Sequence, residues 1–225
     1  GVSSLTSDRI LVGNGTNDPS GLLHLRSATP QLYIQSDDGN DPSIVFGDAS
    51  DASRGQIKYT SSDDMEFKVN NLTTAMTIDS SGHVTKPLQP AFQVQKSGSQ
   101  NSIATGSPVD ITFDSEVFDQ NGDFFNNVFT APVTGKYQFN VHIRIQALDE
   151  FAGFYQIKIQ TSNRTYIFTL DPNGFDEDLD YYSIAFGTLA DMDSSDTAKL
   201  TFTQSGGTQQ SNIHTEAYFT GHLAC

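Results

Sequence analysis

Tryptophan is absent from the 225-residue chain, and cysteine occurs once, as Cys225. A single cysteine cannot form a disulfide within the chain, so cystine does not hold the fold together. Hydrophobic residues make up only 36% of the chain, which disfavours a large self-contained α/β enzyme core. Since no run of about 18 apolar residues occurs, we predict no transmembrane helix and no insertion into a membrane.

Basic residues are also scarce. The chain has 12 Lys and Arg against 27 Asp and Glu, a net charge of −15, which would repel a phosphate backbone and argues against a nucleic-acid partner. The chain begins at Gly1 without a methionine or a basic-then-apolar leader. We therefore expect it to be part of a longer or processed protein.

The length predicts two units. Pro87 and Pro90 oppose regular strand pairing on either side of them, so we place the units at residues 1–90 and 91–225. In the first unit, short runs of alternating apolar residues separated by turn residues predict a meander of strands. These runs contain Leu32 and Ile34; Ile44 and Phe46; Ile57 and Tyr59; Met65, Phe67 and Val69; and Met76 and Ile78.

A unit of this size buries too little surface to offset the cost of ordering its backbone. The simplest way to cover its apolar stripe is with copies of itself around an axis. Residues 19–25, 32–47 and 75–84 of this unit resemble the shafts of phage tail fibres and related adhesins. The resemblance implies an intertwined trimeric β shaft.

Regular alternation is stronger in the second unit. Tyr137, Phe139, Val141, Ile143 and Ile145 alternate with polar residues, as in a strand with one face in a core. We predict that this is the central strand of a two-sheet, jelly-roll sandwich. Further strands are predicted around Val109–Ile111–Phe113, Tyr155–Ile157–Ile159, Tyr166–Phe168–Leu170, Tyr182–Ile184–Phe186, Leu200–Phe202 and Ala217–Phe219.

Residues 129–139 (FTAPVTGKYQF) resemble the signature of C1q-like and tumour-necrosis-factor-like domains. Phe113, Asp119 and Phe124 precede it at the spacing of that signature, and residues 218–223 (YFTGHL) are similar to the last strand of the family. The resemblance implies an all-β C1q-like head that forms a homotrimer with aromatic residues between subunits. The residues that carry the signature are Phe129, Gly135, Tyr137, Phe139, Tyr218, Phe219 and Gly221.

The densest acidic cluster on the chain lies between residues 171 and 180, and carboxylate oxygens are the ligands that Ca²⁺ prefers. The C1q-like resemblance also implies calcium near this loop. The predicted ligands are Asp171, Asp176, Asp178 and Asp180, and the alternative is a solvated acidic loop. No other cofactor is expected.

A polar stretch at residues 204–212 has the composition of a flexible binding loop. Its predicted ligand-binding residues are Gln204, Thr208, Gln209, Gln210 and Asn212. By contrast, the five histidines show no HExxH spacing, and no Gly-x-Ser-x-Gly motif occurs. His142 is predicted to be a polar strand residue rather than a general base. We therefore expect no catalytic residue and no enzyme.

The leading hypothesis is a trimeric tail-fibre or receptor-binding protein of a phage virion. It would attach without catalysis to a glycan or protein receptor on a host cell and would contact other tail proteins. One alternative is a secreted, extracellular C1q-like lectin or ligand of a cellular organism, for which Asn14, Asn71 and Asn163 would be glycosylation sequons. Another alternative is a depolymerase of envelope polysaccharide, which would use two carboxylates.

Overall fold

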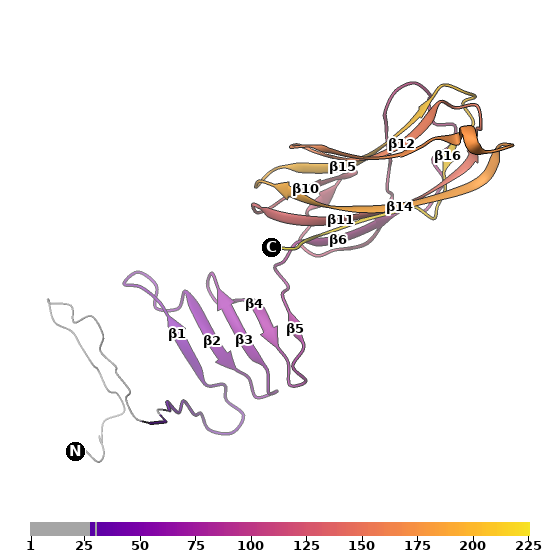
Figure 1. Cartoon of the computed structure of the whole chain (residues 1–225). Coiled ribbons are helices and arrows are strands. Elements are labelled where there is room, and N and C mark those ends of the chain that lie inside the picture. Colours follow the sequence, from indigo (N-terminus) through magenta and orange to yellow (C-terminus); the bar gives the residue numbers. More distant parts are fainter. Residues whose placement is uncertain (1–27, 30) are drawn as a thin grey trace, which may run out of the picture. The chain divides into compact units, whose positions relative to one another are not determined.

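The computed structural model describes residues 28–29 and 31–225. The chain divides into two compact units, Gly1–Val84 and Thr85–Cys225. Both contain strands and turns, and a single 3₁₀ turn, η1 (Pro172–Gly174), is the one helical element in the described residues (Figure 1). No helix in this part of the chain is long and apolar enough to span a membrane. The predicted shaft motif at residues 19–25 and the sequon at Asn14 lie outside the described residues.

The first unit contains one five-stranded sheet whose spatial order is the order of the sequence. This confirms the predicted meander. Its strands are β1 (Ser43–Phe46), β2 (Gly55–Tyr59), β3 (Met65–Val69), β4 (Thr73–Ile78) and β5 (Val84–Thr85). Asn70, Asn71 and Leu72 connect β3 to β4 with positive φ angles, a conformation that asparagine tolerates better than most residues.

The prediction of a strand at Leu32 and Ile34 was wrong, because these residues form no strand in the chain. Residues 31–36 have no strand assignment, although their apolar pattern is correct for one. A strand exists only when a neighbour pairs with its backbone. β1 lies at the edge of the sheet, and this segment does not join it.

The second unit, the head, consists of two antiparallel sheets. The front sheet has the order β14-β11-β17-β6-β8, with β16 pairing to β11, and the back sheet has the order β13-β12-β15-β10-β9, with β7 pairing to β15. The chain crosses between these two layers several times, as from β6 to β7, from β10 to β11 and from β14 to β15, and the two layers are seen in Figure 1. The head is therefore a jelly-roll sandwich, as predicted.

The strands of the front sheet are β6 (Ala91–Gln95), β8 (Ser115–Asp119), β11 (Gly135–Leu148), β14 (Leu179–Met192), β16 (Asn212–Ile213) and β17 (Tyr218–Leu223). Those of the back sheet are β7 (Val109–Asp110), β9 (Phe124–Phe125), β10 (Val128–Thr130), β12 (Phe154–Thr161), β13 (Thr165–Leu170) and β15 (Thr197–Ser205). β11 pairs with both β14 and β17, so it is an interior strand, although it lies second in the order, beside the edge strand β14, and β17 holds the centre.

A cluster of aromatic rings fills the head between the sheets. Phe92 stacks on Phe129 at 4.9 Å between ring centroids, and Phe139 lies 5.5 Å from Phe219. All four rings are buried. Because each sheet turns its alternate apolar residues toward this cluster, the head has a complete core within one chain.

Candidate functional site

The residues of the C1q-like signature lie on β10, β11 and β17, and most of them build the core. Tyr137 is buried and donates a hydrogen bond from its hydroxyl to the Val133 carbonyl at 2.7 Å. A Cβ added to Gly221 would lie 2.5 Å from the ring of Phe92 and 2.7 Å from that of Phe139. Glycine is thus required there by the close approach of the rings. Tyr218 differs, since its side chain points outward and is exposed.

The acidic loop between β13 and β14 uses its carboxylates to fix its own backbone. Asp171 accepts hydrogen bonds from the backbone N–H of Asn173 at 3.0 Å and from its side-chain amide at 2.7 Å, which caps η1. Asp178 accepts from the Gln210 side-chain amide at 2.7 Å and from the Glu150 N–H at 2.9 Å. The Gln210 amide and then the Glu150 N–H lower the pKa of Asp178.

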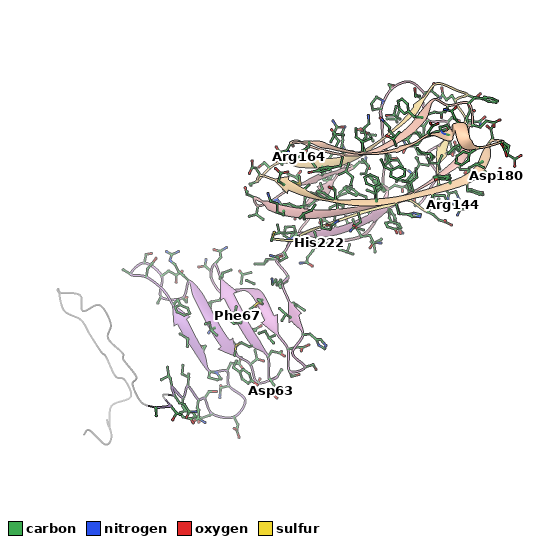
Figure 2. The ribbon with its side chains drawn as sticks, in the orientation of Figure 1. Asp63, Phe67, Arg144, Arg164, Asp180 and His222 are labelled. Carbon is green, nitrogen blue, oxygen red and sulfur yellow. The ribbon has the colours of Figure 1, made fainter. Side chains whose placement is uncertain are left out.

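These contacts do not fit the predicted calcium site. Asp176 and Asp180 are exposed, and Figure 2 shows Asp180 at one end of the sandwich. Across the described residues, no three side chains of His, Cys, Asp or Glu gather as a metal site requires. Asp171 accepts hydrogen bonds from N–H groups of the protein through Oδ1, and Asp178 does so through both carboxylate oxygens. The four predicted ligands do not form a metal-binding group within the described chain.

The side chains of the polar loop after β15 make hydrogen bonds within the head. Gln204 is fully buried, and its amide donates to the carbonyls of Gly206 and Thr208 at 3.0 and 2.8 Å. The Gln209 amide donates to the Ser102 carbonyl at 2.7 Å. Asn212 accepts from the Ser102 N–H at 2.6 Å. Composition correctly indicated that this loop is polar, but it did not indicate which groups its side chains bind.

Asp149 anchors the same loop and was not predicted. It is buried, and its carboxylate accepts hydrogen bonds from the Phe151 N–H at 2.8 Å and from the Thr208 N–H. The hydroxyl of buried Tyr155 accepts from the Asp149 N–H at 2.8 Å. Only the tertiary structure identifies this role, because an aspartate after a long strand reads in sequence as an ordinary turn residue.

The outer face of the front sheet carries a second group that the sequence did not reveal. On β11 and β14, the guanidinium of Arg144 lies 4.0 Å from the ring centroid of Tyr181 and forms an ion pair with Glu216. His142 stacks on Tyr218 at 5.0 Å, with 11° between the ring planes. We call this surface the aromatic face; it comprises a group of contacting residues, His142, Arg144, Tyr181, His214, Glu216 and Tyr218. Leu189 belongs to the same outer face farther along β14, opposite Gln138.

The aromatic face is suited to contact with another macromolecule. The outer face exposes the large side chains of Tyr181, Leu189 and Tyr218. The inner face of the same sheet, by contrast, packs into the core of the sandwich. The guanidinium of Arg144 stacks on the Tyr181 ring and also forms an ion pair with Glu216. Arginine often makes both kinds of contact at protein interfaces. His142 makes a 2.8 Å contact from Nδ1 to the Glu216 carbonyl and is a residue of strand β11, as predicted.

No family model and no curated protein matches the sequence. Solved structures similar to the chain include the globular domain of the zebrafish complement 1qA protein, with 19% identity, a TM-score of 0.45, and coverage of 61% of this chain and 98% of that one. Murine APRIL at pH 8.5 is similar with 6% identity and a TM-score of 0.43, covering 60% of this chain and 98% of that one. At these scores the likeness says nothing about function.

Proposed function

We propose that the protein is a trimeric, non-catalytic attachment protein of a virion, of the phage tail-fibre type. In this proposal the first unit is a shaft in which three chains intertwine, and the head is the part that meets a glycan or protein receptor on the host cell. Other tail proteins would hold the shaft. This places the protein outside the host cell, on the virion.

The observation that supports this function best is the aromatic face of the front sheet. Soluble monomers rarely leave large apolar side chains open together, and such patches are typical of association sites. Closed cyclic symmetry is the usual outcome when like chains associate. The residues that resemble the C1q-like signature, among them exposed Tyr218, favour three chains.

Trimerisation would also let a head whose single binding site is weak attach firmly to a cell. Three copies of one weak site on a rigid head bind a repetitive surface with much higher avidity than one copy, by roughly 10² to 10⁴ where the geometry allows simultaneous contact. A bacterial envelope presents such repeats. Attachment would then depend on assembly, which gives the proposal a direct test.

The test pairs two substitutions on opposite sheets of the head. Leu189 on the front sheet and Ile167 on the back sheet are 54% and 53% exposed, so neither Leu189→Glu nor Ile167→Glu removes a core residue. Light scattering should give the native chain and Ile167→Glu a mass of three times the 24.5 kDa chain. Leu189→Glu should dissociate, or should lose the trimer at a lower denaturant concentration, because it places three like charges at the interface.

The same three proteins are then tested for adsorption to a panel of bacterial cells, with and without chelator. We expect the native chain and Ile167→Glu to adsorb and Leu189→Glu to lose about 10²-fold in apparent affinity. No reducing sugar should be released from envelope polysaccharide. A native mass of one chain, or equal adsorption by a dissociated Leu189→Glu, would contradict the proposal, and release of sugar would favour a depolymerase.

A further inference from the structure

A groove lies on one side of the head, where β8 and β9, the edge strands of the two sheets, come together. Its volume of about 300 Å³ is at the lower end of the range of small-ligand pockets, roughly 300–1,000 Å³. The lining includes Phe113, Asp114, Glu116, Phe125, Asn126 and Asn127. The groove thus combines aromatic rings, carboxylates and amides.

A tight hairpin presents the exposed ring of the groove. Asn126 and Asn127 join β9 to β10 with positive φ angles of 50° and 67°, and asparagine is favoured in two-residue turns of this kind. Consecutive strand residues point to opposite sides. Phe124 therefore stacks on Phe92 in the core at 5.0 Å, whereas Phe125 projects outward and is 83% exposed.

The polar groups of the groove are anchored but keep bonding capacity. Asp114 accepts hydrogen bonds from the Ser97 N–H at 2.6 Å and from the Ser97 hydroxyl at 2.8 Å, and these bonds lower the pKa of Asp114. Asn127 accepts from the Phe113 N–H at 2.6 Å through Oδ1, which leaves its amide N–H groups to donate. The Glu116 carboxylate has no partner among the described residues.

The charge of the groove is negative. Within the described residues, no lysine or arginine belongs to its lining. Lys96 interacts with Asp114, but it is 5% exposed and its ammonium donates to the Thr112 carbonyl at 2.8 Å. Carboxylates in a groove that no cation lines repel an anion. The groove therefore suits a neutral or positively charged ligand that is rich in hydrogen-bond donors.

A sugar ring fits this combination of groups. Its C–H face can lie on an exposed aromatic ring, while its hydroxyls donate to carboxylates and accept from amides. A protein receptor would need a larger surface, since a standard interface buries about 800 Å² on each partner, and the groove offers one highly exposed ring.

The groove is also separate from the outer surface of β14, which carries Tyr181 and Leu189. β8 and β14 are the two edges of the front sheet, and four strand spacings of about 4.8 Å place them about 19 Å apart. Association of chains through β14 would therefore leave the groove accessible.

We propose that the groove between β8 and β9 binds one sugar unit, uncharged or amine-bearing, of a host-surface glycan. The sugar ring would stack on Phe125, with its polar groups bonded to Asp114, Glu116 and the amides of the turn. This inference rests on the proposed attachment function and assigns it a class of receptor and a site on the head.

The test compares Phe125→Ala with Phe151→Ala in the full chain. Phe151 is 80% exposed, lies between β11 and β12, and does not line the groove, so it is a matched exposed ring. Asn126→Gly removes an amide and keeps a residue that adopts positive φ readily. Glu116→Gln removes a charge. All four variants should keep the native mass.

Each protein is titrated onto immobilised oligosaccharides that are uncharged, amine-bearing, or anionic through uronic acid or sulfate. We expect the native chain and Phe151→Ala to bind uncharged or amine-bearing saccharides and not the anionic ones. Phe125→Ala should weaken the affinity of each site about tenfold, and Asn126→Gly about threefold. Glu116→Gln should weaken binding of amine-bearing saccharides more than that of uncharged ones.

Binding of anionic saccharides alone, binding of none, or equal affinity of Phe125→Ala and Phe151→Ala would overturn the inference. Adsorption to cells is measured after periodate, which cleaves sugar diols, and separately after protease. Adsorption that only protease abolishes would also overturn it, in favour of a protein receptor.

The outcomes for the groove and for attachment can be told apart. Equal adsorption to cells by the native chain and Phe125→Ala would overturn the assignment of the groove while the attachment function stands. Saccharide binding that depends on Phe125, in a protein that adsorbs to no cell, would support the groove while contradicting attachment.

Discussion

The two units of this chain contain similar strands but reach stability by different routes. The head has two sheets whose inner faces cover each other, so its aromatic cluster is complete within one chain. The N-terminal unit has one sheet, and its apolar residues are half-buried or exposed. The difference teaches that alternation predicts a strand well, whereas the number of layers decides whether the unit folds alone.

The largest expected effect is on the head core. Phe139→Ala should lower the free energy of unfolding by about 3–5 kcal/mol, because a ring packed against four other aromatic rings is replaced by a cavity. The matched control is Phe125→Ala, since Phe125 is 83% exposed, and its effect should stay within about 0.5 kcal/mol. Denaturant titration of the head transition measures both. Equal losses would show that the aromatic cluster is not the core of the head.

A smaller effect, dependent on protein concentration, is expected for the N-terminal sheet. Phe67 pairs with the apolar residues Ile57 and Met76 on the neighbouring strands and is half-buried in one chain, so Phe67→Ala should cost about 1–2 kcal/mol at low concentration. The loss should grow as the protein is concentrated, because association adds to the stability of the native side chain. Titrations at two concentrations tenfold apart check this. A loss of unfolding free energy that is the same at both concentrations and as large as that of Phe139→Ala would contradict the expected difference between the two units.

The smallest effect concerns one aspartate–arginine pair in each unit. The pKa of Asp48 is lowered to about 2 by the Ser50 hydroxyl, by Arg54 and by backbone N–H groups. Arg164, whose guanidinium binds both carboxylate oxygens, lowers the pKa of Asp191 to about 2. Because both values lie below the ordinary 3.8, each pair adds stability above that pH that is lost as the pH falls toward 2.

Removing the arginines should separate the two aspartates. Arg164→Gln should return the pKa of Asp191 most of the way to 3.8, since the Arg164 side chain is its main cause. Arg54→Gln should raise the pKa of Asp48 less, because the hydroxyl and N–H of Ser50 and the N–H of Asp51 still donate to it. Carboxyl-carbon NMR titration measures both values. An equal rise of the two aspartate pKa values in the two variants would contradict this assignment of the partners of Asp48 and Asp191.

Much of the fold could be predicted from alternation. The strands β1 to β4, β11, β12, β13, β14, β15 and β17 lie on runs that the sequence predicts, and β11 is an interior strand, although it is not the central one. The short strands β9 and β16 could not be found in this way, since two residues carry no period. Val109–Ile111–Phe113 shows the limit, because only Val109 and Asp110 pair with β15.

The candidate sites were harder to predict for a physical reason. Composition showed that residues 171–180 and 204–212 are polar, but a carboxylate or amide that binds solvent or a ligand looks the same in sequence as one that binds its own backbone. Asp178 joins Gln210 and Glu150 across long stretches of chain. Such partners depend on which loops the topology brings to one end of the sandwich.

Sequence alone thus determined the all-β class, the meander and the long alternating strand β11 with one face in the core, since these follow from local periodicity. Only the tertiary structure decided which polar side chains form the hydrogen bonds that fix the loops, that Asp149 is buried, and which sheet faces of the two units are exposed. Those features arise from contacts between segments distant in the chain, and side-chain chemistry does not encode a partner by itself.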